Sequence, residues 1–169
     1  MYAQVAREFG GALTRLARAY ETDPDRRQDL LQEIHIALWR SFSTFDGRCS
    51  LRTWVYWVAH NVAASQVVRR RARLRTLVSL DALASTPGSQ DSEKSYDRRL
   101  ALDRLLMLIH ALQPVDKQVM LLYLEGVDAA SIGEITGISA ANVATKVHRI
   151  KQMLAQRFHE GGPHERTDS

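Results

Sequence analysis

The chain has 169 residues, of which 45% are hydrophobic and 25% are charged, and its formal net charge at pH 7 is +4. This length suits one or two small water-soluble domains, and no uninterrupted apolar run approaches the roughly 20 residues that span a membrane. The single cysteine, Cys49, excludes an internal disulfide, and no cysteines and histidines have zinc-ligand spacing. We expect a cytoplasmic protein with no metal, cofactor or membrane insertion, and the positive charge favours a polyanionic partner.

Two amphipathic helices are predicted at the start of the chain. The first covers residues 3–20, where apolar side chains recur at helical spacing, and a Gly-Gly pair in its middle allows a kink or break. Asp23 and Pro24 then end that helix and begin the next, with Asp23 as the cap and Pro24 at the first helical position. The second helix is expected over about 24–41.

The second helix has an unusual outward face. Its inward side carries apolar residues for a core, whereas the outward side places Ile36 among acids and an amide. Apolar groups rimmed by charge are typical of partner surfaces, although a single exposed isoleucine is also ordinary. The residues on this outward face are Asp29, Gln32, Glu33, Ile36 and Arg40, with Trp39 at its margin.

The segment 45–75 combines a turn, a capped helix and a run of arginines. Asp46 and Gly47 supply the turn, and Ser50 is a good N-cap for a helix that begins at Leu51. One face of this helix is a core stripe, formed by Leu51, Trp54, Val55, Val58 and Val62. The stripe beside it contains Trp57, Asn61, Ala64 and Val68, and it leads into Arg69, Arg70, Arg71, Arg73 and Arg75.

That second stripe suits a nucleic-acid strand. Arginines neutralise phosphates, the Trp57 ring can stack on an unstacked base, and the Asn61 amide can read a base edge. The structural alternative is a partly buried aromatic ring followed by a solvated basic helix end. Cys49, just before this helix, could be redox-active, but a lone thiol is usually incidental.

A linker separates this half from a second helical module. Residues 82–97 are rich in Ser, Asp, Pro and Gly and have almost nothing to bury, which places the boundary within about 76–97. The second module begins with a helix over about 97–112, and Pro114 opens another that ends at Gly126. The apolar stripe of the first of these helices contains Leu102, Leu105, Leu106 and Ile109.

The next segment has the pattern of a helix-turn-helix. Asp128 caps a short helix, Gly137 supplies the turn and Ser139 caps a longer helix, while small Gly133 lets the two helices cross closely. The alternative is a helical hairpin with a solvated basic face. In the DNA-binding interpretation 140–156 is the recognition helix, and its outward residues are Asn142, Thr145, Lys146, His148, Arg149 and Lys151.

Both halves resemble the small extracytoplasmic-function (ECF, group 4) type of the sigma-70 family of RNA polymerase sigma factors. The family's polymerase-docking segment is similar to residues 29–39, DLLQEIHIALW. Its minus-ten segment is similar to residues 45–71, FDGRCSLRTWVYWVAHNVAASQVVRRR, and its minus-thirty-five domain to residues 112–154. The resemblance covers nearly all of 5–157 in the family's order.

This resemblance implies an all-α fold of two small helical domains, a region 2 bundle and a region 4 helix-turn-helix, joined by a flexible linker. Region 2 would occupy residues 1–75, the linker 76–97 and region 4 98–158. A disordered tail would occupy residues 159–169.

The resemblance also implies three binding surfaces. Core polymerase would contact Asp29, Gln32 and Glu33, to which the outward face adds Ile36. For the minus-ten element, duplex and melted non-template strand, the resemblance implies contacts from Phe45, Asn61, Arg69 and Arg70, with Phe45 and Asn61 holding extruded bases and Trp54 in the core. To these contacts we add Trp57, from the second stripe, and Arg48. The minus-thirty-five duplex would contact Thr145, Lys146, Arg149 and Lys151, with Asn142 and His148 beside them.

Some positions depart from the family pattern. Ser131-Ile132-Gly133 stands where Glu-Ile-Ala is usual, and Ala144 stands where a basic residue is common. These departures bear on the strength and sequence of upstream binding. His148 contacts DNA if it is exposed and packs against the core if it turns inward.

The implied function is a non-enzymatic promoter-specificity subunit that binds the clamp helices and flap of core RNA polymerase and recognises two promoter elements. Such factors are commonly held inactive by an anti-sigma factor, which is therefore a candidate partner. The alternative is a polymerase-independent helix-turn-helix regulator, which leaves the outward face of the second helix unexplained. An enzyme is a more distant alternative, because the sequence has no glycine-rich phosphate loop and no nucleophile with a plausible base.

Overall fold

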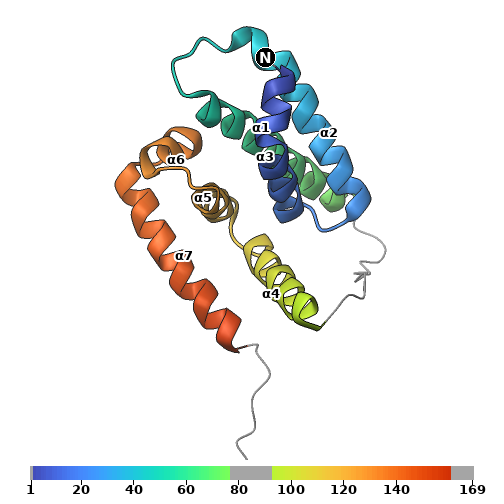
Figure 1. Cartoon of the computed structure of the whole chain (residues 1–169), viewed down its shortest axis with the longest axis vertical. Helices are drawn as coiled ribbons and strands as arrows, with labels where there is room; N and C mark the ends of the chain where they lie inside the picture. The colour runs from blue at the N-terminus through green and yellow to red at the C-terminus, as the bar shows by residue number, and fades with distance from the viewer. Residues whose placement is uncertain (1, 77–92, 161–169) are drawn as a thin grey trace, which may run out of the picture. The chain divides into compact units, whose positions relative to one another are not determined.

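The residues that the computed structural model describes are 2–76 and 93–160, with side chains over 2–70 and 99–159. Every regular element in these ranges is a helix (Figure 1), so the predicted all-α fold is confirmed. The chain divides into two compact units, residues 1–101 and 102–169. The linker and tail sequences at 77–92 and 161–169 lie outside the described residues. Among the described helices, none has both the length and the apolar character that crossing a membrane requires.

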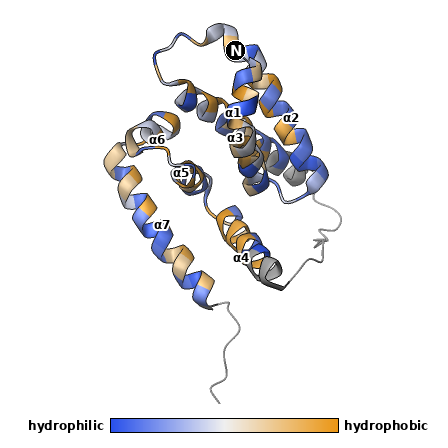
Figure 2. Cartoon of the chain, viewed as in Figure 1, coloured by the Kyte–Doolittle hydropathy of each residue, from blue (hydrophilic) through white to orange (hydrophobic). Residues whose placement is uncertain are grey.

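The first unit is a three-helix bundle with one short extra turn. Its α2 packs against both α1 and α3. Hydrophobic and hydrophilic residues alternate around α1 and α2 (Figure 2). The elements are α1 (Tyr2–Tyr20), α2 (Pro24–Ser41), the short 3-10 helix η1 (Phe42–Thr44) and α3 (Leu51–Thr76). The most deeply buried apolar side chains are Val5, Leu13, Leu30, Ile34, Leu38 and Val55.

Side-chain caps begin α2 and α3 where the sequence predicts. The Asp23 carboxylate accepts a hydrogen bond of 3.0 Å from the backbone N–H of Arg26, and this bond lowers the pKa of Asp23. The Ser50 hydroxyl oxygen accepts a 3.0 Å hydrogen bond from the backbone N–H of Thr53. Each cap satisfies an N–H group that the first helical turn leaves unpaired. Both predicted helix starts are confirmed.

The Gly-Gly pair does not break α1, which runs unbroken past both glycines to Tyr20. Each glycine costs a helix roughly 1 kcal/mol relative to alanine. Phe9 and Leu13, on either side of the pair, are buried against the bundle, and burying one such side chain contributes about 1.5–3 kcal/mol. Packing therefore outweighs the weakness that the local sequence predicts.

The second unit is built on a compact group of three helices, in which α5, α6 and α7 pack against one another. It contains α5 (Pro114–Leu124), α6 (Ala129–Thr136), α7 (Ala140–Glu160) and the end of α4 (Glu93–His110), since the boundary between the units falls within α4. The most deeply buried apolar side chains are Ile109, Val119, Leu122, Ile132, Val143 and Ile150. Two helices are longer than the sequence predicts, since α4 begins before Asp97 and α7 continues beyond Gln156.

The helix-turn-helix geometry is confirmed. Gly137 ends α6 with a φ of +76°, in the left-handed region that favours glycine. Gly133 faces the turn so closely that a Cβ there would lie 2.6 Å from the carbonyl oxygen of Ile138. The Asp128 carboxylate accepts from two backbone N–H groups at the start of α6, and the Ser139 hydroxyl accepts from the N–H of Asn142 at 3.3 Å.

Burial along the apolar stripe of α4 increases towards the end of the helix. Leu102 is 53% exposed, Leu105 and Leu106 are half-buried, and only Ile109 is fully buried. Within the second unit, α4 is therefore most deeply buried near its end, at Ile109. Helical periodicity indicates which side chains share a face, but not how far along that face a neighbour extends.

Candidate functional site

The outward face of α2 is exposed, as the sequence predicts. Asp29, Gln32, Glu33 and Arg40 are all solvent-accessible. The apolar residues on and beside this face are accessible too, since Ile36 is 40% exposed and Trp39 is 64% exposed. A large indole and an isoleucine in water beside carboxylates form a surface that burial against a partner would stabilise.

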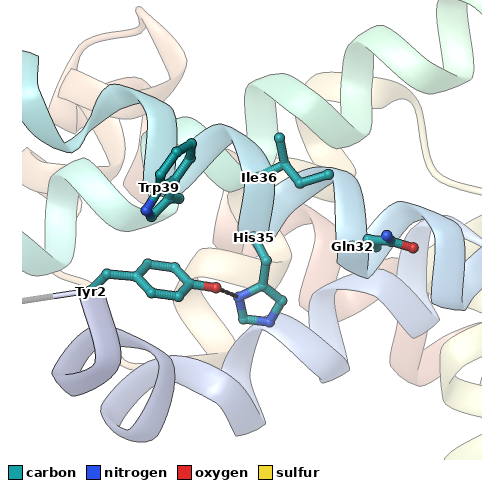
Figure 3. Close-up of a pocket in the computed structure, with 5 residues that line it drawn as sticks. All are labelled: Tyr2, Gln32, His35, Ile36 and Trp39. Atoms are coloured by element: carbon teal, nitrogen blue, oxygen red, sulfur yellow. Dashed lines mark hydrogen bonds between the residues drawn. The ribbon is translucent and has the colours of Figure 1, made fainter.

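A hollow of about 240 Å³ lies on this face, lined by Tyr2, Gln32, His35, Ile36 and Trp39. Figure 3 shows the Tyr2 ring reaching from α1 to His35, while Ile36 and Trp39 project from α2. The Tyr2 hydroxyl and Nδ1 of His35 are hydrogen-bonded at 3.0 Å, and the rings meet edge to face. Partial burial lowers the pKa of His35 below its usual value, which keeps the ring neutral at neutral pH.

Tyr2 and His35 are not predicted from the sequence as part of this surface. Their contact joins residues 33 positions apart, and neither helix carries a local signal for it. The hollow thus extends the predicted face of α2 towards the beginning of α1.

An aromatic cluster supports the loop between α2 and α3. The rings of Phe42 and Phe45 lie 5.0 and 5.1 Å from the ring of Trp54, measured between centroids. Trp54 is buried, as predicted for the core, while Phe45 is half-exposed. The loop turns at Gly47, whose φ is +75°, and the predicted DNA contact Arg48 pairs with Asp46 at 2.8 Å. One face of Phe45 is therefore held by packing while its other side is accessible.

The second stripe of α3 is accessible where a strand could lie on it. Trp57 is 49% exposed, Asn61 is exposed and Val68 is 66% exposed. This exposure contrasts with the buried stripe of the same helix, where Val55 is inaccessible. The side chains of the arginines beyond Arg70 lie outside the described residues.

Acids hold the two described arginines at the basic end of this stripe. Arg70 forms a 2.8 Å ion pair with Glu21, whose carboxylate is only 8% exposed. Arg69 lies 3.5 Å from Glu33, with both side chains half-exposed. Glu33 belongs to the predicted polymerase surface and Arg69 to the predicted promoter surface, so the two surfaces adjoin at this pair.

A neutral histidine lies in the core next to Asn61. His60 is 1% exposed, and its Nδ1 is 3.1 Å from the hydroxyl of Tyr20. Burial lowers the pKa of His60 to about 3 and raises the pKa of Tyr20 above its usual value. Both groups therefore stay uncharged at neutral pH. This pair is not predicted from the sequence, because its members are 40 positions apart.

The recognition helix α7 presents the residues that the sequence places outward. Its exposed members are Asn142, Thr145, His148, Arg149 and Lys151, and Lys146 is partly buried. The exposure of His148 excludes the inward-packed alternative for that side chain. The cationic side chains of Lys146, Arg149 and Lys151 form a surface that suits the phosphates and major-groove edges of a duplex.

Residues of α5 contact all three of these cationic side chains. Asp116 accepts from Nζ of Lys146 at 2.6 Å and from Nη2 of Arg149 at 3.0 Å. The ammonium of Lys151 lies 5.5 Å from the ring centroid of Tyr123, within cation–π range. Asp116 and Tyr123 are not predicted from the sequence, because their contacts connect residues about thirty positions apart.

Comparison with known families identifies both units. The family model for Sigma-70 region 2 matches residues 5–73, and the model for Sigma-70 region 4 matches residues 102–154. The chain belongs to the sigma-70 family. Two sigma regions in the family's order disfavour the polymerase-independent regulator.

Curated relatives place this sigma factor in the ECF type. It is 27% identical to the ECF RNA polymerase sigma factor SigX of Bacillus subtilis, over 80% of this chain and 72% of the relative. It is 26% identical to the ECF sigma factor SigE of Mycolicibacterium smegmatis, over 89% of this chain and 59% of the relative.

Solved structures show the same fold. The sigma factor RpoE of Bartonella quintana, crystallised with the anti-sigma factor NepR, has a TM-score of 0.72 at 18% identity and covers 95% of this chain and 97% of its own. CnrH, in complex with the cytosolic domain of CnrY, has a TM-score of 0.69 at 18% identity and covers 95% and 89%.

The predicted function is confirmed at the level of the family. This sigma factor is a promoter-specificity subunit of RNA polymerase, and its partners are core polymerase and promoter DNA. Sigma factors are regulatory rather than enzymatic proteins.

Proposed function

We propose that each of the three surfaces described above has a separate role in initiation. The hollowed face of α2 docks on the clamp helices of core polymerase through Asp29, Gln32, Glu33 and Ile36, with Tyr2 and Trp39 at its edge. The second stripe of α3 takes the melted minus-ten strand, and α7 takes the minus-thirty-five duplex. The observation that carries this proposal is the exposure of Trp57 and Asn61 on a helix whose neighbouring face is buried.

On the minus-ten side, extruded bases would be captured by neutral groups. Phe45 and Trp57 offer accessible ring surfaces, and Asn61 lies one helical turn after Trp57 to hydrogen-bond a base edge. Stacking contributes about 1–3 kcal/mol per base. That energy offsets part of the cost of opening the duplex. Arg48, Arg69 and Arg70 would follow the backbone phosphates.

On the minus-thirty-five side, the contacts would be largely ionic. Lys146, Arg149 and Lys151 would bind phosphates and base edges of the duplex, with Asn142, Thr145 and His148 placed among them. Such contacts displace counterions from DNA, so they weaken as salt rises. The second unit would also meet the polymerase flap.

We propose that an anti-sigma factor holds this chain inactive. The support is that both solved structures named above are complexes of a sigma factor with a second protein, called an anti-sigma factor for RpoE. The chain would act in the cytoplasm, with no enzymatic activity or cofactor of its own.

Transcript mapping tests the proposal. Purified protein would be added to sigma-free core polymerase and a genomic fragment library, and the transcript starts sequenced with and without it. Starts that depend on the protein and share two upstream elements support the proposal and supply the promoter. Duplex binding without polymerase, with no dependent starts, would favour the regulator alternative.

A charge reversal tests the docking surface. Glu33→Arg should abolish dependent starts and co-elution with core, because it places a cation at the rim of the docking face. The matched control is Asp25→Arg, the same reversal in the first turn of α2. Equal losses in both variants would contradict the docking role of Glu33.

A further inference from the structure

One carboxylate contacts two of the three cationic side chains named above on the recognition helix. Asp116 lies in the first turn of α5, and its side chain is 14% exposed. One oxygen accepts from Lys146 at 2.6 Å and the other from Arg149 at 3.0 Å. Both carboxylate oxygens are therefore engaged, each by a cation from a different turn of α7.

The two cations differ in what they leave accessible. The Lys146 side chain is 29% exposed, whereas the Arg149 side chain is 65% exposed. A lysine has three donors on a flexible stem and an arginine five in a planar fork. One guanidinium nitrogen of Arg149 contacts Asp116, and most of the side chain remains accessible to solvent.

Asp116 also cancels part of the positive charge of this surface. Lys146 and Arg149 together carry two positive charges, and the carboxylate between them carries one negative charge. Non-specific attraction to DNA grows with the number of phosphates neutralised. A duplex of any sequence is thus attracted less strongly than it would be by Lys146 and Arg149 without Asp116.

We propose that Asp116 is a positioning residue for upstream-element recognition. By fixing Lys146 and Arg149 in one arrangement and lowering their net charge, it makes binding depend on where the duplex presents its acceptors. The proposal rests on the assignment of α7 to the minus-thirty-five element under the proposed function. Asp116 itself touches no DNA in this account.

The test uses holoenzyme assembled from the full chain and core polymerase. The two probes are a promoter duplex obtained by transcript mapping and the same duplex with its upstream element scrambled. The variants are Asp116→Asn, which removes the charge, and Asp116→Glu, which keeps it. The control is Glu134→Gln, since Glu134 is exposed on α6 and makes no ion pair within the described part of the chain.

Asp116→Asn should bind the scrambled duplex more tightly, and its preference for the intact element should fall about 5- to 10-fold. Its binding should also depend more steeply on salt, by about one unit in the slope of log K against log salt. Asp116→Glu should restore both quantities, and Glu134→Gln should match wild type. The thermal unfolding midpoint of each variant checks that the second unit stays folded.

The outcomes separate this inference from the function on which it rests. If wild type prefers the intact element and Asp116→Asn keeps the wild-type preference and slope, Asp116 is not a positioning residue. An equal loss of affinity for both probes, with an unchanged slope, would assign Asp116 a merely structural role. If wild type shows no upstream preference, the assignment of α7 fails, and this inference fails with it.

Discussion

The DNA contacts proposed for the two units are opposite in character. In the first unit the central groups are neutral: the Phe45 ring, the Trp57 ring and the Asn61 amide. In the second unit they are cationic, and residues of α5 hold each one in place. Stacking on a base depends little on salt, whereas contact with phosphates depends on it strongly. The difference suggests a division of labour, in which one unit captures separated bases and the other reads a closed duplex.

Removing the neutral groups should have the largest effect on activity. Trp57→Ala combined with Asn61→Ala deletes one stacking surface and one amide, and stacking alone contributes about 1–3 kcal/mol per base. We expect promoter opening to fall about 100-fold or more, measured by permanganate reactivity of thymines that become unpaired. Ser65→Ala, exposed on the same helix, is the control. If the double variant opens the promoter as well as wild type does, the neutral groups of the first unit do not capture the separated bases.

Acid should destabilise the first unit before the second. Burial lowers the pKa of His60 from 6.5 to about 3, so between these values the unfolded chain binds a proton that the folded chain does not. The free energy of unfolding should therefore fall as pH drops below about 6.5, by up to about 1.4 kcal/mol per pH unit. The described histidines of the second unit, His110, His148 and His159, are exposed or half-exposed.

Tryptophan fluorescence can follow this transition in the first unit alone. The chain has three tryptophans, and all of them, Trp39, Trp54 and Trp57, lie in that unit. His60→Gln should flatten the pH dependence of urea unfolding detected in this way. An unchanged dependence in the variant would show that another group is responsible.

Removing a single positive charge from the second unit should have a smaller effect on DNA binding, and that effect should depend on salt. Lys151→Met removes one phosphate-binding charge while keeping an apolar chain against Tyr123. We expect about a threefold to tenfold loss of holoenzyme binding to the promoter duplex at low salt, shrinking as salt rises. Filter binding over a salt series measures this loss. Gln152→Met, at the next position, should bind like wild type.

The smallest expected effect comes from weakening the ion pair of Arg70 in the first unit. Glu21→Gln weakens the 2.8 Å pair with Arg70. Because the arginine is half-exposed, we expect a loss of only about 1 kcal/mol in the free energy of unfolding. Urea unfolding followed by tryptophan fluorescence measures it. A much larger loss would indicate that the stability of the first unit depends strongly on this ion pair.

The sequence predicts the local parts of this structure well, for a physical reason. Caps such as Asp23 and Ser50, and turns such as the one at Gly137, depend on residues within a few positions of each other. Helical spacing likewise indicates which face of α2 or α7 points outward. These features, and the order of the two sigma regions, follow from short stretches of sequence.

The features that the sequence does not predict depend on the tertiary fold. Asp116 reaches Lys146 across 30 positions and Glu21 reaches Arg70 across 49. Likewise, the burial of Leu102 depends on how far a neighbouring helix extends. Packing also overrides the local weakness of the glycines in α1. The residues that orient the predicted contacts are therefore the part of the site that only the structure provides.

The most direct test of the division of labour is the salt dependence of holoenzyme binding in two variants, measured side by side on one promoter duplex. Lys151→Met should lower the slope of log K against log salt by about one unit, since one phosphate contact is lost. Trp57→Ala should weaken binding at every salt concentration and leave the slope unchanged. Equal slopes for the two variants, or a flatter slope for Trp57→Ala alone, would contradict the account.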